Sequence, residues 1–254
     1  MTQQPAWYQS FFGQDYLDVY GYQFTDERAR VETAFAAGAL DLKPGERVLD
    51  LCCGQGRHAV LLAAMGCETT GLDLSEHYLR LTSEAAEKLG VHVETVHADM
   101  RQIPHEAHFD AIVNMFSSFG YLESEAEDAK VLTSIRRALK PGGRVLLDLL
   151  NRDWVVDNYV QNDWHRDPDG TLYLEHRELD LLTSRNHVTF TAISPDGAQR
   201  EIGGHHIRLY TLREVAGMIE AAGLVYESVH GGFEGEAYSI GTRRMIVVAA
   251  RPAS

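Results

Sequence analysis

Hydrophobic and polar positions follow two different periodic patterns along this chain. From residue 47 to residue 150, short apolar runs alternate with longer segments whose apolar residues recur every three or four positions. This pattern is typical of parallel strands that are connected by helices. Five strands are expected in this part of the chain, at residues 47–51, 68–74, 93–99, 109–116 and 143–150.

The expected helices carry recognisable start and stop signals. Ser75 can cap a helix that Gly90 is placed to end. Nearer the C-terminus, Thr211 and Glu214 form a T-x-x-E capping box for a helix that Gly223 ends. Helices are therefore expected at residues 57–65, 75–89, 125–139 and 211–222.

The second pattern begins near residue 173. Apolar and polar side chains alternate there one by one, and the sequence SPDG at 194–197 is a turn signal. We expect an antiparallel meander over the mouth of a cleft rather than more helical crossovers. Its strands are expected at residues 173–180, 185–194 and 199–209, and strand-like segments at 226–233 and 244–252 close the chain.

Charge and composition exclude several classes of protein. The 254 residues carry a formal net charge of −14, which argues against binding to nucleic acid through a broad positive surface. No window approaches the roughly 18 apolar residues that a membrane span needs, and the start MTQQPAWYQSFFG lacks the basic and apolar regions of a leader. A cytoplasmic protein without nucleic-acid or membrane partners is expected.

Cysteine and histidine residues give no metal-site signature. The three cysteines, Cys52, Cys53 and Cys67, lack the paired spacing of a zinc site or a disulfide framework, so reduced thiols are expected. Among the twelve histidines there is no H-x-x-x-H pair, and His205 and His206 would point to opposite faces of a strand. No metal is expected.

The segment VLDLCCGQGRHA at residues 48–59 has the features of a nucleotide-binding loop. An apolar strand ends near Asp50 and turns through Gly54 and Gly56 into a helix, and GQGRHA fits the loose dinucleotide pattern G-x-G-x-x-A. NAD would place a negatively charged pyrophosphate here, which a carboxylate disfavours. S-adenosylmethionine carries an ammonium and a sulfonium, which a carboxylate attracts. Asp50 therefore favours S-adenosylmethionine.

Two more acidic residues end the next strands. Asp73 lies nineteen residues after Gly54 and can accept hydrogen bonds from both ribose hydroxyls of either nucleotide. Asp99, followed by Met100, is suited to accept a hydrogen bond from an adenine amine. Parallel strands bring their carboxyl ends to one edge of the sheet, so these acids are expected on one rim.

Taken together, these motifs resemble those of the class I S-adenosylmethionine-dependent methyltransferases of the small-molecule type. VLDLCCGQG matches the first motif of that family, GLDLS its ribose-binding segment and HADM its adenine segment. FDAIVNMFSSFGYL and LKPGGRVLLDL match its fourth and fifth strands. The match is close over about residues 40–151. Cys52 departs from the family pattern, because many relatives have glycine there, and a buried structural thiol is the favoured interpretation.

The resemblance implies a role for each matching residue. The methionine portion would lie near the glycine loop, the ribose and adenine near the next two strand ends, and the sulfonium beside the end of the fourth strand. The implied cofactor-binding residues are Asp50, Gly54, Gly56, Asp73, Leu74, Asp99, Met100, Asn114 and Met115, with Phe116 beside the acceptor.

The resemblance also implies the fold. It is of the α/β class: a Rossmann-like mixed sheet of seven strands, the last antiparallel, with helices on both faces. The aromatic N-terminal stretch resembles the lid helices of small-molecule methyltransferases. We expect an N-terminal helical lid at 1–40, the cofactor-binding core at 41–150, an antiparallel β insertion over the active site at 151–209, and a closing helix with two strands at 210–254.

Candidate acceptor residues come from the lid and from the insertion. Tyr16 and Tyr20 are four residues apart and share one helical face; they would touch cofactor or substrate, or belong to a small aromatic core. In GGHHIRLYT, strand alternation places His206, Arg208 and Tyr210 on one face. That face is either a wall of the substrate site, with His206 as a general base, or an exposed polar surface.

The sequence therefore predicts an S-adenosylmethionine-dependent methyltransferase that transfers a methyl group to nitrogen or oxygen of a small molecule. Methyl transfer to such an acceptor is an in-line displacement that depends mainly on positioning. Two alternatives remain open at this point: an NAD-dependent oxidoreductase, and a non-catalytic binder of the methyl donor. If His206 is the base, its replacement by alanine lowers turnover more than cofactor affinity.

Overall fold

The computed structural model describes residues 6–253, and in this part of the chain seven strands form one mixed sheet. The strand order is β10-β11-β5-β4-β1-β2-β3. Only β11 runs antiparallel to its neighbours β5 and β10, as expected for the last strand. The strands are β1 (Arg47–Leu51), β2 (Glu68–Asp73), β3 (Val93–His97), β4 (Phe109–Asn114), β5 (Leu139–Leu150), β10 (Val225–His230) and β11 (Arg244–Ala250).

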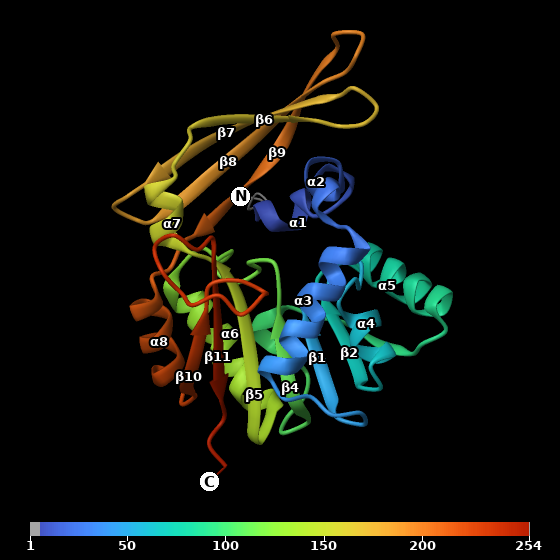
Figure 1. Ribbon diagram of the computed structural model, residues 1–254, viewed down its shortest axis with the longest axis vertical. Coiled ribbons are helices and arrows are strands. Elements are labelled where there is room, and N and C mark those ends of the chain that lie inside the picture. The colour runs from blue at the N-terminus through green and yellow to red at the C-terminus, as the bar shows by residue number, and fades with distance from the viewer. Residues whose placement is uncertain (1–5, 254) are drawn as a thin grey trace, which may run out of the picture.

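Helices cover both faces of this sheet (Figure 1), which confirms the expected α/β class. Along β1, Val48 packs toward α3 and α4, whereas Leu49 packs toward α6 and α8, because successive side chains of a strand point to opposite faces. These helices and their neighbours are α3 (Asp26–Ala39), α4 (Ala59–Ala64), α5 (Glu76–Leu89), η2 (Met100–Gln102), α6 (Glu125–Ala138) and α8 (Leu212–Ala221).

The predicted helix signals are present in the structure. The Ser75 hydroxyl accepts a hydrogen bond from the Tyr78 N–H at 3.3 Å, and Gly90 ends α5 with a left-handed φ of 72°. Thr211 and Glu214 form the predicted capping box of α8. These caps satisfy backbone groups that would otherwise lack partners at the helix ends.

β5 begins at Leu139, four residues before the expected start at Gly143. The segment KPGG therefore belongs to the strand, and the pairing of β4 with β5 shifts between Phe109 and Ala111. A side chain at position 143 would lie 3.0 Å from the Asp110 carbonyl oxygen. Glycine is thus needed for close packing at the bottom of the sheet.

The chain after β5 forms the expected antiparallel meander as a separate sheet, in the order β6-β7-β8-β9. Two of the elements here were not predicted. The edge strand β6, with the sequence NDWHR, is mostly exposed and has no apolar alternation, and α7 has only six residues. These elements are α7 (Arg152–Asp157), β6 (Asn162–Arg166), β7 (Leu172–Asp180), β8 (Arg185–Ile193) and β9 (Gln199–Arg208).

The N-terminal helices α1 (Trp7–Phe11) and α2 (Gln14–Tyr20), followed by η1 (Gly21–Gln23), lie between the two sheets (Figure 1). Phe11 and Val19 pack with Phe190 of the small sheet, while Ala36 of α3 packs on the large sheet. The segment expected to form one lid is therefore divided between two packing units. Its residues 1–5 lie outside the described residues.

Candidate functional site

A cavity of about 420 Å³ lies at the carboxyl ends of β1, β2 and β4, below α1 and α2. In an open α/β sheet, ligands bind outside the carboxyl ends of the strands where the strand order reverses, and here β1 is that point. The wall includes most of the residues predicted from sequence: Tyr16, Gly54, Asp73, Leu74, Asp99, Met100, Met115 and Phe116.

The glycine loop after β1 depends on left-handed backbone conformations. Gly54 has φ 56°, and a Cβ there would meet nothing within 4 Å, so its backbone faces open space in the cavity wall. Cys52, where relatives often have glycine, also takes a left-handed φ of 62°. Burial raises the pKa of the Cys52 thiol well above its usual value, which opposes formation of a reactive thiolate.

Gly56 does not line the cavity, contrary to the expectation that it surrounds the ligand. A Cβ at this position would lie 2.6 Å from Cγ2 of Thr82 on α5. The residue is therefore required for packing between the loop and α5, at a φ of 80°.

Asp73 holds the glycine loop and also lines the cavity. Its Oδ2 accepts a hydrogen bond from the Gly54 N–H at 2.9 Å, and its Oδ1 accepts one from the Ser75 N–H at 2.9 Å. Burial raises the pKa of Asp73 above its usual value, and these N–H donors offset part of that effect. The carboxylate is thus fixed at the rim beside Gly54.

Asp99 and Met100 lie at the next position along the rim. Although burial alone would raise the pKa of Asp99, hydrogen bonds from Arg101 hold it below its usual value. Arg101 donates to Asp99 Oδ2 at 2.6 Å and to Glu127 at 2.7 Å. Met100 packs beside Cys52, its sulfur 3.6 Å from Sγ. This end of the cavity combines an ionised acid with the apolar side chain of Met100.

Asp50 and Asn114 lie beneath the cavity instead of lining it. Each is only 1% exposed, because Asp50 in β1 and Asn114 at the end of β4 lie in the centre of the sheet. Within the described residues, neither Asp50 carboxylate oxygen has a hydrogen-bond partner, and burial raises the pKa of Asp50 to about 7. Asn114 donates to the Leu51 carbonyl at 2.8 Å, so it fastens β4 to β1.

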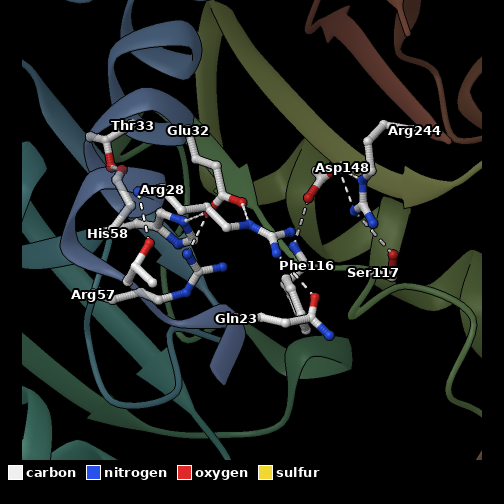
Figure 2. A network of polar contacts seen from close by, with 12 residues as sticks. Gln23, Arg28, Glu32, Thr33, Arg57, His58, Phe116, Ser117, Asp148 and Arg244 are labelled. Carbon is white, nitrogen blue, oxygen red and sulfur yellow. Dashed lines mark hydrogen bonds and ion pairs between the residues drawn. The ribbon is translucent and has the colours of Figure 1, made fainter. Parts of the chain in front are cut away.

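A buried polar network below α3 was not predicted (Figure 2). The Glu32 carboxylate is 1% exposed and accepts hydrogen bonds from Arg28 Nε at 2.7 Å, from Arg57 Nη1, and from His58 Nε2 at 2.8 Å. Despite the opposing effect of burial, these partners lower the pKa of Glu32 far below its usual value. The guanidinium carbons of Arg28 and Arg57 each lie 5.3 Å from the centre of the Phe116 ring.

Arg57 and His58 of this network line the cavity, and Arg57 is the cationic one of the two. The sequence signal was the arginine in GQGRHA, directly after the loop, but nothing in the sequence connects it to Glu32, which lies 25 residues earlier. Guanidinium groups bind carboxylates through paired hydrogen bonds. Arg57, oriented by Glu32, can hold an anionic group at this end of the cavity.

Of the two predicted tyrosines, Tyr16 lines the cavity and Tyr20 does not. The Tyr20 hydroxyl lies 2.6 Å from Nε2 of His205, and its ring packs against Phe190. Burial lowers the pKa of His205 to about 3, so this histidine is neutral. Tyr20 therefore belongs to the aromatic core that joins α2 to the small sheet.

His206 and Arg208 also lie outside the cavity wall, which corrects their expected roles. His206 contacts His187 on the neighbouring strand through Nδ1. Arg208 is buried and forms ion pairs with Glu125 at 2.9 Å and Glu214 at 2.6 Å. These partners occupy its guanidinium group.

A β-bulge determines which face of the C-terminal part of β9 packs against α1 and α2. The pairing with β8 changes between Val188 and Phe190, where a Cβ on Gly204 would lie 1.7 Å from the Val188 carbonyl oxygen. This extra residue in β9 places His205, rather than His206, on the same face as Ile202. Simple alternation cannot detect it.

Two further findings concern the described residues as a whole. Between residues 6 and 253, no group of three or more His, Cys, Asp or Glu side chains is arranged to hold a metal ion. No helix in the same range is long and apolar enough to cross a membrane.

Comparison with known proteins identifies the family. The model of a methyltransferase domain family matches residues 48–143, which contain the glycine loop and the acidic rim. The chain is a class I S-adenosylmethionine-dependent methyltransferase. Neither alternative, an NAD-dependent oxidoreductase or a non-catalytic binder, is supported by the comparisons.

The similarity extends beyond the matched domain of this methyltransferase. The dTDP-3-amino-3,4,6-trideoxy-alpha-D-glucopyranose N,N-dimethyltransferase of Streptomyces venezuelae is 28% identical, over 89% of this chain and 97% of its own length. The structure of Streptomyces venezuelae DesVI has 26% identity and a TM-score of 0.69, covering 94% of this chain and 98% of that one. The CcbJ methyltransferase from Streptomyces caelestis, 23% identical, has the same fold with a TM-score of 0.81 over 96% of this chain and 99% of its own.

The residues present fit S-adenosylmethionine. The cavity offers open backbone at Gly54, a fixed carboxylate at Asp73 and an arginine at Arg57. The Asp50 carboxyl group is buried below the loop and has no hydrogen-bond partner within residues 6–253; when it is ionised, above about pH 7, it supplies negative charge for a cationic ligand. These are the groups that an amino acid joined to a nucleoside requires.

Proposed function

We propose that this methyltransferase transfers methyl groups to the nitrogen of a small polar amine of the amino-sugar class. The observation that carries the proposal is the extent of the similarity. The amino-sugar N,N-dimethyltransferases of Streptomyces venezuelae and Saccharopolyspora spinosa match 89% and 92% of this chain. Glycine/sarcosine N-methyltransferase of Halorhodospira halochloris is 33% identical but matches only 52%. The longer matches exceed the cofactor-binding domain alone.

The cavity wall supports a cationic product. Aromatic side chains from α1, α2 and the loop after β4 line it, among them Phe12, Tyr16, Phe116 and Tyr121. Aromatic faces attract cations within about 6 Å. Positive charge passes from the sulfonium to the amine as the methyl group is transferred, so rings beside the acceptor stabilise the charge that develops on its nitrogen.

The proposed roles follow the positions in the wall. Asp73 and Leu74 hold the ribose, Asp99 and Met100 receive the adenine, and Gly54 with Arg57 receives the amino acid end. Asp50 lies below the amino acid end and attracts its ammonium when the carboxyl group is ionised. Met115, Phe116 and Tyr16 then surround the transferable methyl and the acceptor.

S-adenosylmethionine supplies an electrophilic methyl group on a sulfonium. The protein's part is to align the acceptor and exclude water, and such positioning can lower the barrier by about 7–11 kcal/mol. Burial raises the pKa of Tyr16, so its hydroxyl stays protonated and orients the acceptor. His58 is held by Glu32, and burial lowers the pKa of His58. Only an unprotonated amine has the lone pair that the displacement requires, so the amine has to react as the free base.

The test uses pairs of acceptors that differ in one group. Amino sugars, free and nucleotide-linked, are compared with analogues that carry a hydroxyl in place of the amine, and methyl incorporation from S-adenosylmethionine is measured by mass spectrometry. The expected result is methylation of the amine and none of the hydroxyl analogue. Methylation confined to hydroxyl compounds would refute the proposed acceptor class while leaving the family assignment intact.

A further inference from the structure

The turn that follows β4 contains two consecutive strained residues. Phe116 and Ser117 have φ values of 60° and 61°, in the left-handed region that favours glycine. A non-glycine residue in this conformation is strained and persists only where its surroundings enforce it. Phe116 also lines the cavity, so the strain lies in the wall of the active site.

Asp148 on β5 holds the backbone of both strained residues. Its Oδ2 accepts a hydrogen bond from the Phe116 N–H at 2.8 Å, and its main-chain carbonyl accepts one from the Ser117 N–H at 2.9 Å. The side chain is 1% exposed. A carboxylate in this position fixes the turn against the adjacent strand.

Arg244, the first residue of β11, completes this arrangement. Its Nε donates to Asp148 Oδ1 at 2.6 Å, and its Nη2 donates to the Ser117 hydroxyl at 3.2 Å. Figure 2 shows these groups on one side of Phe116, with Arg28 on the other side. Asp148 and Arg244 themselves are absent from the cavity wall, so they can act only through the turn.

We propose that Asp148 and Arg244 are positioning residues, which hold the Phe116 ring in place beside the methyl group in transit. The inference rests on the proposed function for the place of that methyl group. The ring is fixed from behind by the strained turn and lies close to the guanidinium groups of Arg28 and Arg57. Displacement of a reacting partner by about 1 Å can lower the rate about 100-fold.

The experiment compares D148N and R244Q with the wild-type enzyme. D148N keeps the size of the side chain but removes its charge, and R244Q removes the cation while leaving the aspartate in place. We expect turnover of the acceptor to fall at least about tenfold in both, while the Kd of S-adenosylhomocysteine changes less than about threefold, as positioning predicts. R244K, which keeps the charge, should recover part of the turnover.

A second measurement needs no acceptor. Sinefungin carries an ammonium group in place of the transferable methyl, so its affinity relative to S-adenosylhomocysteine reports on the wall around that group. Calorimetry should show this ratio changing in D148N and R244Q. If the wild-type enzyme methylates no amine, the acceptor proposal fails, but the affinity ratio still tests the positioning role.

D110N is the matched control. Asp110 lies at the other end of β4, where it accepts a hydrogen bond from the Arg47 N–H at 2.9 Å and pairs with Lys140 at 2.7 Å. Like Asp148, it accepts hydrogen bonds from a backbone N–H and from a basic side chain, but neither Arg47 nor Lys140 lines the cavity, whereas Asp148 holds the wall residue Phe116. D110N should lower stability and leave the kinetics of the folded enzyme unchanged. An unchanged affinity ratio and turnover in D148N, or losses matched by D110N at equal folded fraction, would overturn the proposal.

Discussion

Carboxylates at the ends of the central strands have different surroundings and therefore different tasks. Asp73 accepts backbone hydrogen bonds at the rim, whereas Asp50 is buried beneath it without a partner among the described residues. Sequence position alone predicted that both would face the ligand. Which groups surround each carboxylate depends on strands that are distant in the sequence. Sequence position alone therefore could not show that Asp50 is buried and Asp73 lies at the rim.

Replacement of Asp73 by alanine should weaken the binding of S-adenosylhomocysteine by about 1–3 kcal/mol. The change removes the proposed ribose contact and the hydrogen bond that fixes the Gly54 N–H. Calorimetry measures the loss directly. Glu76, exposed in the first turn of α5, provides the control in E76A, and equal affinity of D73A and wild type would remove Asp73 from the site.

His206→Ala should leave both turnover and cofactor affinity close to wild-type values. The β-bulge turns this side chain away from the cavity and toward His187. Steady-state kinetics with a methylated acceptor provide the measurement. A selective loss of turnover, with S-adenosylhomocysteine affinity preserved, would instead restore His206 as a candidate base.

At the scale of elements, the core strands were predictable to within a few residues because each is a short apolar run with a polar end. The same argument failed for β6, which is polar and exposed at an edge, and for the start of β5 in KPGG. Helix caps were predictable because capping is local chemistry. The face of β9 that packs against α1 and α2 was not predictable, since the bulge in β9 depends on how this strand pairs with β8.

The two loop glycines should respond differently to alanine. G56A should lower the melting temperature strongly, because its Cβ would collide with Thr82, and T82A should recover part of the loss. G54A meets no clash, so its loss of stability should be limited to the strain of alanine at a left-handed φ and be smaller than that of G56A, while cofactor binding becomes weaker. Thermal unfolding and calorimetry distinguish the two, and equal stability losses would contradict the division of roles.

At the scale of the whole molecule, one buried carboxyl group should make stability depend on pH. The pKa of Asp50 is raised from an ordinary value of 3.8 to about 7 by burial. Between these values the folded protein keeps a proton that the unfolded chain releases, so the free energy of unfolding falls as pH rises. Above about pH 7 the contribution becomes constant.

D50N should remove this dependence. The difference in unfolding free energy between wild type and D50N should fall by up to about 1.4 kcal/mol per pH unit as the pH rises toward 7. Urea unfolding of the ligand-free proteins between about pH 5 and pH 8 measures it. Parallel curves over this range would show that Asp50 is ionised in the folded protein at all these values.

The small sheet and the first two helices are joined by more than apolar packing. Arg200 of β9 binds Asp15 at 2.6 Å and Asp18 at 2.9 Å, and Tyr20 bonds to His205. A displacement of α1 and α2, which supply part of the cavity wall, would therefore carry the small sheet with it. A ligand that holds these helices against the large sheet would in turn restrict the small sheet.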